Sequence, residues 1–156
     1  MDIDAFRAAL EPGRRLIGVD VGTKTLGLAL SDVGRMIGSA LETIRRTKFK
    51  ADVARLLSLA EEHGVGGFVI GLPLNLDGSQ GPRAQASRAF ARNLAQLTPW
   101  PLLLWDERLS TAEAERMLIA ADTTRRRRAE VIDKLAATLI LQGALDRLKG
   151  LEAEQG

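Results

Sequence analysis

The chain has 156 residues, no cysteine and a formal net charge of only +2. This length suits one domain whose core is large enough to fold without staples, and the lack of cysteine excludes disulfides and thiolate metal sites. No apolar run approaches the ~18 residues of a membrane span, and the first residues are not a positively charged leader. We therefore expect a cytoplasmic protein without membrane partners, in which clustered arginines matter more than the net charge.

Hydrophobic periodicity predicts a single α/β domain over residues 14–150, with an N-terminal extension over 1–13 and a flexible tail over 151–156. Three early strands predict an antiparallel meander, and two later apolar strands predict parallel pairing, so the sheet should be mixed with helices on both faces. In chain order we expect helix 2–11, strands 16–19, 25–30 and 36–44, helix 48–63, strand 67–71, helix 82–97, a strand from 102, helix 110–121, a flexible basic segment 122–128 and a helix from 129.

Asp20 lies at the end of the first apolar strand, immediately before a turn that contains Gly22. A carboxylate at the tip of an apolar strand is costly to desolvate unless a cation or hydrogen-bond donors meet it. A divalent metal is one partner that would explain it, and Lys24 in the turn can face an anion. The alternative is that Asp20 only caps the turn.

A loop rich in glycine and proline spans residues 72–83 and ends where the next helix begins. Pro82 suits the first turn of that helix, so free amide groups and the side chain of Arg83 would face the loop. An anion could bind there. The alternative is a connection that needs glycine and proline only for its turns.

Asp106 and Glu107 follow the fifth apolar strand. Strand alternation points them to opposite faces, so only one of them can readily share a site with Asp20. The alternative is that both acids are solvated at the strand end and that Arg108 pairs with one of them.

The last predicted helix carries Asp133 on or beside its inward face, because the apolar Ala136, Ala137 and Ile140 follow at helical spacing. An acid early in a helix also suits the helix dipole, which is the alternative. If this helix meets the strand ends, Asp20, one of the two adjacent acids and Asp133 form a set of three carboxylates. Such ligands suit Mg²⁺ or Mn²⁺ rather than zinc, and can hold two ions for phosphodiester hydrolysis.

Four consecutive arginines stand shortly before this helix, namely Arg125, Arg126, Arg127 and Arg128. A basic run by itself is usually a solvated loop. Beside an acidic metal site it could hold a phosphate backbone.

Four motifs in this order resemble the YqgF family over about residues 14 to 148. They are Val19-Asp20-Val21-Gly22-Thr23-Lys24-Thr25, Gly71-Leu72-Pro73-Leu74-Asn75-Leu76-Asp77-Gly78, Asp106-Glu107-Arg108-Leu109-Ser110-Thr111 and Asp133-Lys134-Leu135-Ala136-Ala137. The resemblance implies a ribonuclease H-like fold, a relation to bacterial Holliday junction resolvases, and a nuclease that matures the 5′ end of pre-16S ribosomal RNA.

The resemblance also implies that Asp20, Glu107 and Asp133 are the catalytic, metal-binding acids, and it prefers Glu107 to Asp106. The resulting hypothesis is a nuclease that uses Mg²⁺ or Mn²⁺ on structured nucleic acid, most of all precursor ribosomal RNA. Its phosphate contacts would come from basic side chains at the predicted strand ends and in the basic run: Lys24, Arg83, Arg108 and Arg125 to Arg128.

Three alternatives stay open. A Holliday junction resolvase would use the same chemistry on branched DNA but needs a homodimer that presents two sites. The sequence Asp20-Val21-Gly22-Thr23 also resembles the phosphate loop of actin-like ATPases and sugar kinases, although those proteins need two such domains. The third alternative is a ribosome-assembly binding module without catalysis.

Overall fold

The computed structural model describes residues 1–109 and 125–155, with side chains for residues 1–109 and 135–154. Within these ranges no helix is both long and apolar enough to cross a membrane. The elements in chain order are α1 (Ile3–Ala9), β1 (Arg15–Val21), β2 (Thr25–Ser31), β3 (Gly38–Arg45), α2 (Phe49–Glu62), β4 (Val65–Leu72), α3 (Pro82–Ala95), β5 (Leu102–Asp106), a 3-10 turn (Glu107–Leu109) and α5 (Arg125–Gln155).

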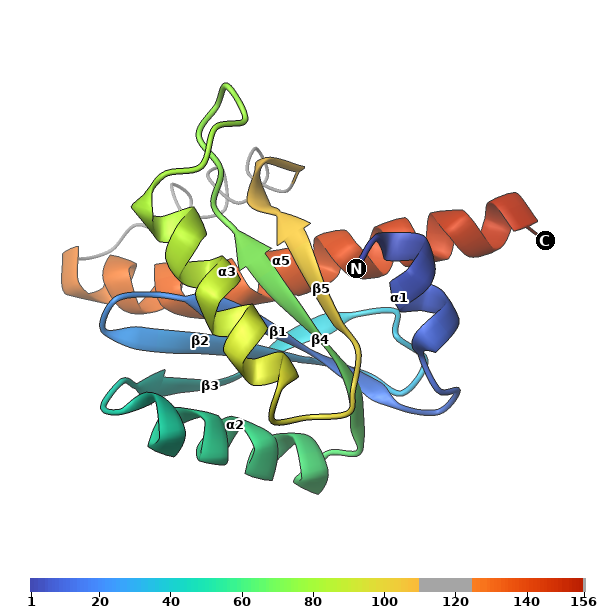
Figure 1. The fold of residues 1–156 in the computed structure, drawn as a ribbon, viewed down its shortest axis with the longest axis horizontal. Coiled ribbons are helices and arrows are strands. Elements are labelled where there is room, and N and C mark those ends of the chain that lie inside the picture. The colour runs from blue at the N-terminus through green and yellow to red at the C-terminus, as the bar shows by residue number, and fades with distance from the viewer. Residues whose placement is uncertain (110–124, 156) are drawn as a thin grey trace.

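The sheet has five strands in the order β3-β2-β1-β4-β5. β1 pairs antiparallel with β2, and β2 pairs antiparallel with β3, whereas β4 lies parallel to both β1 and β5. The predicted mixed sheet is therefore confirmed (Figure 1). Because β1, β3, β4 and β5 all run in one direction, their carboxyl ends meet at one edge, together with the start of β2.

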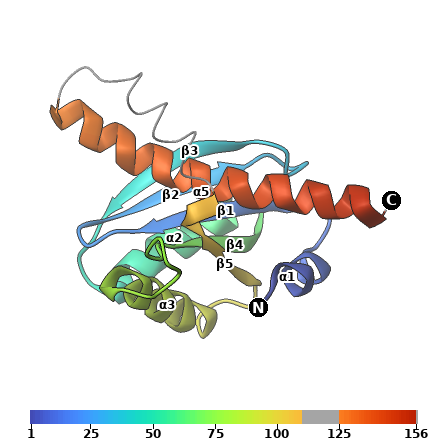
Figure 2. The same ribbon diagram turned by 90° about the horizontal axis from the view of Figure 1, so that it is seen from above.

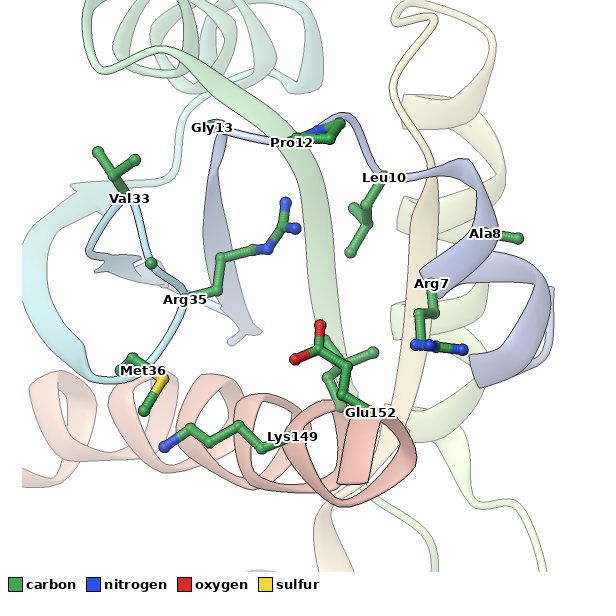
Figure 3. Close-up of a pocket in the computed structure, with 12 residues that line it drawn as sticks. Arg7, Ala8, Leu10, Pro12, Gly13, Val33, Arg35, Met36, Lys149 and Glu152 are labelled. Carbon is green, nitrogen blue, oxygen red and sulfur yellow. The ribbon is translucent and has the colours of Figure 1, made fainter. Parts of the chain in front are cut away.

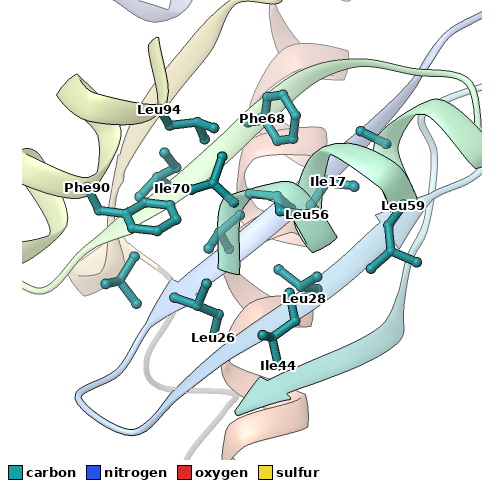
Figure 4. Close-up of a cluster of buried hydrophobic side chains, with 14 of the residues drawn as sticks. Ile17, Leu26, Leu28, Ile44, Leu56, Leu59, Phe68, Ile70, Phe90 and Leu94 are labelled. Carbon is teal, nitrogen blue, oxygen red and sulfur yellow. The ribbon is translucent and has the colours of Figure 1, made fainter. Parts of the chain in front are cut away.

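Helices cover both faces of the sheet, as predicted. Helices α2 and α3 lie on one face, and the long helix α5 crosses the other, as the view from above shows (Figure 2). Under α2 and α3 lies an apolar core that includes Ile17, Leu56 and Phe90 (Figure 4). Under α5 lies a second core, to which the N-terminal helix α1 contributes the fully buried Phe6.

The alternation of β1 assigns its residues to these two cores. Ile17, Val19 and Val21 belong to the core under α2 and α3, while Leu16 belongs to the core under α5. Asp20 therefore lies on the α5 side of the sheet. The same face lets α5 approach closely at Gly18, where an added Cβ would come within 2.7 Å of the Leu141 Cβ.

The structure differs from the sequence prediction at both ends of the last helix. Helix α5 begins at Arg125, so the four arginines that were expected in a flexible segment are helical, in line with the good helix propensity of arginine. It also runs to Gln155, and Leu151 is only 6% exposed, so the expected flexible tail is wrong over these residues. The predicted helix over 110–121 and the basic residues 122–124 lie outside the described residues.

Candidate active site

The turn after β1 presents Asp20 at the edge where the strands end. Asp20 is the last but one residue of β1 and is half-buried. Two residues later, the backbone N–H of Gly22 donates to the carbonyl of Thr25 at 2.9 Å. An added Cβ at Gly22 would lie 2.8 Å from that carbonyl oxygen, so this tight turn requires glycine.

Arg46, just after β3, holds this turn from the α2 side of the sheet. Its Nη1 donates to the carbonyl of Gly22 at 2.7 Å, and its backbone N–H donates to the carbonyl of Lys24 at 2.8 Å. Its Nε lies 3.9 Å from Oδ2 of Asp52, a carboxylate on α2 that is only 3% exposed. No role was predicted for Arg46 from the sequence, because no local pattern shows which carbonyl a side chain reaches.

Glu107 enters the same edge from β5, as the first residue of the 3-10 turn. Burial raises the pKa of its carboxyl to about 7, and the negative charge of Asp20 adds to this rise, while Arg83 opposes it. Close packing against Glu107 explains why β4 has a glycine at position 71. An added Cβ at Gly71 would lie 2.9 Å from Oε1 of Glu107 and would overlap the side chain of Ile140.

Asp106 points away from this pair. Nη2 of Arg108 lies 2.7 Å from Oδ2 of Asp106, and Nε of Arg108 donates to Oδ1 at 3.0 Å. These hydrogen bonds hold the pKa of Asp106 below its usual value. Of the two adjacent acids, Glu107 lines a cleft with Asp20, and Asp106 is not part of that lining. Arg108 pairs with Asp106, and its Nη1 also donates to the carbonyl of Leu76 at 3.4 Å.

Asp20 and Glu107 line one cleft with a volume of about 850 Å³. The cleft places three positively charged side chains around the two acids: Lys24 from the β1–β2 turn, Arg45 from β3 and Arg83 from the first turn of α3. Hydroxyl groups complete the polar lining, from Thr23, Thr25 and Thr43. Among the predicted site residues, Asp20, Glu107, Lys24 and Arg83 thus line one cleft, whereas Arg108 is not part of the lining.

Arg45 and Thr43 line the cleft although no role was predicted for them from the sequence. Both lie on edge strand β3, which runs one residue past the predicted strand 36–44. Their alternation along β3 was a usable signal, because residues 43 and 45 must share a face. The sequence did not show which face meets the cleft.

Asp133 and the four arginines from 125 to 128 lie within α5, but their side chains are outside the described part of the chain. Ala136, which stands one helical turn after Asp133, does line the cleft. The backbone of α5 therefore passes the cleft close to position 133. The assignment of Asp133 to the acidic set stays a prediction.

The donors of the cleft suit a hard divalent cation. Asp20 and Glu107 are carboxylates in one cleft, and each would be better compensated by a cation than by its acidic neighbour. Among side chains in ranges 1–109 and 135–154, no group of three potential ligands forms a metal site. A third acid would have to come from another part of the chain.

A second cleft, of about 450 Å³, lies at the opposite end of β1 and β2. Figure 3 shows Arg35, from the β2–β3 turn, and Glu152, from α5, pointing into it. Nη1 of Arg35 donates to the carbonyls of Glu11 and Arg14 at 3.1 and 3.2 Å. The guanidinium of Arg35 thus joins the β2–β3 turn to the segment before β1.

Comparison with known proteins gives a consistent picture. The family model described as "RuvX: Holliday junction resolvase" matches residues 14–147. A curated protein of Methylocella silvestris named "Putative pre-16S rRNA nuclease" is 56% identical over 99% of this chain and 96% of its own length. One of Cereibacter sphaeroides with the same name is 60% identical over 98% of this chain and 96% of its own length.

Solved structures with low sequence identity share the fold. Thermus thermophilus RuvC in complex with a Holliday junction is 12% identical, with a TM-score of 0.56 over 90% of this chain and 96% of that chain. The yeast mitochondrial Holliday junction resolvase Ydc2 is 11% identical, with a TM-score of 0.50 over 97% of this chain and 86% of that chain. The ribonuclease H-like fold predicted from the sequence is therefore confirmed.

Proposed function

Because this chain belongs to the RuvX (YqgF) family, we propose that it is a divalent-metal-dependent nuclease that hydrolyses phosphodiester bonds in structured nucleic acid. Its proposed substrate is the 5′ end of precursor 16S ribosomal RNA, after the name that its relatives carry. Its proposed location is the cytoplasm, which suits a chain without cysteine.

The observation that carries this proposal is the pair of carboxylates, Asp20 and Glu107, in one cleft with cationic side chains around them. Together with Asp133, these two acids would hold Mg²⁺ or Mn²⁺, because all three offer only hard oxygen ligands. Such cations, when bound, activate water and stabilise the leaving oxygen in phosphodiester hydrolysis.

The protonation of Glu107 sets a condition for this role. A carboxylate must be ionised to bind a divalent cation. Since burial and Asp20 raise the pKa of Glu107 to about 7, a fraction of the free protein keeps this proton at neutral pH. The nearby Arg83 favours the ionised form of this carboxyl group.

Lys24 and Arg83 would bind phosphates beside the acids. Arg83 is the second residue of α3, whose N-cap, Gly81, offers no side-chain hydrogen bond to the first turn. The free N–H groups of that turn and the Arg83 guanidinium therefore favour an anion at one place. In this proposal Arg108 acts indirectly, through its contacts with Asp106 and the loop carbonyl of Leu76.

The four arginines of α5 extend the proposed phosphate contacts along the helix. Neutralising Arg125 to Arg128 should weaken binding to any sequence and flatten its dependence on salt. An unchanged salt slope, measured by fluorescence anisotropy, would exclude this role.

The second candidate is a Holliday junction resolvase that acts on branched DNA. The description of the matching family model favours it. This candidate requires a homodimer with two active sites, so a strictly monomeric complex with a four-way junction would count against it.

The deciding experiment compares cleavage of labelled precursor ribosomal RNA and of a four-way DNA junction. Each is incubated with Mg²⁺, with Mn²⁺ and with a chelator, using the wild type and Asp20→Asn. Metal-dependent cutting of the RNA alone, lost in Asp20→Asn, supports the maturation nuclease, and cutting of the junction alone supports the resolvase. Binding of both without cutting of either would contradict the nuclease and favour an assembly factor.

A further inference from the structure

The charged residues of edge strand β3 divide into two groups by face. On the α2 side, both carboxylate oxygens of Glu42 accept hydrogen bonds from Arg55, at 2.7 and 2.9 Å. Arg46, on the same side just after the strand, is bound to the Gly22 carbonyl and lies beside Asp52. The charges on this face are therefore used within the protein.

Arg45 points the other way, into the cleft of the two acids. It is exposed, and no hydrogen bond or ion pair joins its side chain to any other side chain or carbonyl in the described ranges. Thr43 lies next to it on the same face and is also exposed. An arginine on a cleft wall that serves no internal partner is available to a ligand, and the ligand that suits its planar fork is a phosphate or a carboxylate.

The register of the sheet places this pair relative to the acids. Asp20 is directly opposite Gly27 on β2, and Gly27 is opposite Thr43 on β3. With adjacent strands about 4.8 Å apart, Thr43 lies about 10 Å from Asp20 across the sheet. Glu107 follows β5 on the other side of Asp20, with Arg83 beside it. Arg45 and Arg83 therefore flank the two acids from opposite sides.

We propose that Arg45 and Thr43 form a phosphate-binding site on β3, so that the backbone of the nucleic acid crosses the cleft from Arg83, over Asp20, to Arg45. This inference rests on the proposed nuclease function and adds the path of the cleaved strand. The guanidinium of Arg45 holds a phosphate through paired N–H donors, and the hydroxyl of Thr43 donates a further hydrogen bond. Because both contacts go to the backbone, the site selects no base sequence.

The test measures binding without cleavage. A fluorescein-labelled stem–loop RNA with a single-stranded 5′ tail is titrated with protein in the presence of a chelator, from about 50 to 200 mM KCl. The variants are Arg45→Gln, Arg45→Lys and, as a matched control, Arg92→Gln, which removes an exposed arginine from the last turn of α3, outside the cleft. Circular dichroism verifies that each variant is folded.

Arg45→Gln should weaken binding about tenfold and lower the salt slope by about one, whereas Arg92→Gln should change neither. Arg45→Lys should keep the salt slope but lose part of the affinity, because an ammonium cannot form the paired contact. Equal behaviour of Arg45→Gln and Arg92→Gln would overturn this proposal and leave the nuclease function intact. If the wild type itself does not bind the RNA, the proposed function fails, and this inference fails with it.

Discussion

The two clefts at opposite ends of β1 and β2 differ in how their charges are compensated. In the smaller one, the Arg35 guanidinium binds two backbone carbonyls, and Lys149 lies 3.7 Å from a carboxylate oxygen of Asp146. In the larger one, Glu107 is half-buried beside a second acid, and its pKa rises to about 7. A half-buried acid with a raised pKa therefore distinguishes the candidate active site better than the mere presence of a cavity does.

The largest expected effect is on cleavage, and it should differ between the two clefts when a glutamate in each is replaced by glutamine. Glu107→Gln removes a proposed metal ligand, so we expect cleavage to fall at least about 1000-fold. Glu152→Gln makes the same chemical change in the smaller cleft, and cleavage should stay within twofold of the wild type. Steady-state cleavage assays of both variants would measure this contrast, and equal losses would contradict the assignment of the active site.

Glycine substitutions should separate the two clefts by stability. Gly71→Ala places a methyl group against Glu107 and Ile140, so the free energy of unfolding should fall by about 2–3 kcal/mol. Gly34→Ala, in the smaller cleft, meets its nearest side-chain atom at 3.5 Å, an ordinary contact, and should cost less than about 1 kcal/mol. Urea denaturation of both variants tests this, and a Gly71→Ala protein as stable as the wild type would show that the packing above β4 is loose.

Arginine substitutions should separate a positioning role from a purely structural one. Arg46→Ala removes the donor to Gly22 and leaves the buried Asp52 without its cation, which should cost about 2 kcal/mol of stability. Because the turn after Asp20 loosens, cleavage should also fall about tenfold or more.

Arg35→Ala is the control for this variant, since Arg35 also donates to two backbone carbonyls. It should cost about 1 kcal/mol and leave cleavage unchanged. Cleavage is measured at a temperature where both variants are fully folded. Full activity of Arg46→Ala there would contradict the positioning role.

The last expected effect is a dependence of stability on pH. The Glu107 carboxyl releases its proton near pH 7 in the folded protein, against an ordinary value of 4.5. Between these values the folded state binds more protons than the unfolded chain, so stability falls as the pH rises through this window. The urea midpoint of the metal-free wild type should therefore decrease from pH 5 to pH 8 more than that of Glu107→Gln.

Asp106→Asn is the matched control for this measurement. The pKa of Asp106 is lowered by Arg108, so its contribution is lost only as the pH falls below the ordinary range of an aspartate. The charge of Asp106 is only the smallest of the causes that shift the pKa of Glu107, so the difference in midpoint between wild type and Asp106→Asn should change little from pH 5 to pH 8. If the difference between wild type and Glu107→Gln changes no more than this, Glu107 does not have a raised pKa.

Local patterns in the sequence determined most of the fold. Together with the family resemblance, they also identified four residues that line the cleft: Asp20, Lys24, Arg83 and Glu107. Within residues 1–109 and 125–155, alternation and helical spacing predicted the strands and helices to within a few residues, because each pattern reports which side chains must be buried. Alternation also separated Asp106 from Glu107, and the structure bears this out. The tail after residue 150 was predicted wrongly, since Leu151 continues the apolar spacing of α5 and is buried only because α5 lies on the sheet.

The tertiary structure decided which charged side chains line the cleft and which bind other groups of the protein. Arg45 and Arg46 are adjacent in sequence, yet Arg45 lines the cleft while Arg46 holds the turn after Asp20. Similarly, Arg83 faces Glu107, and Arg108 pairs with its neighbour Asp106. The sequence identifies all of these as charged residues near strand ends. Their partners come from segments distant in the chain, and only the packing of the sheet against its helices brings those segments together.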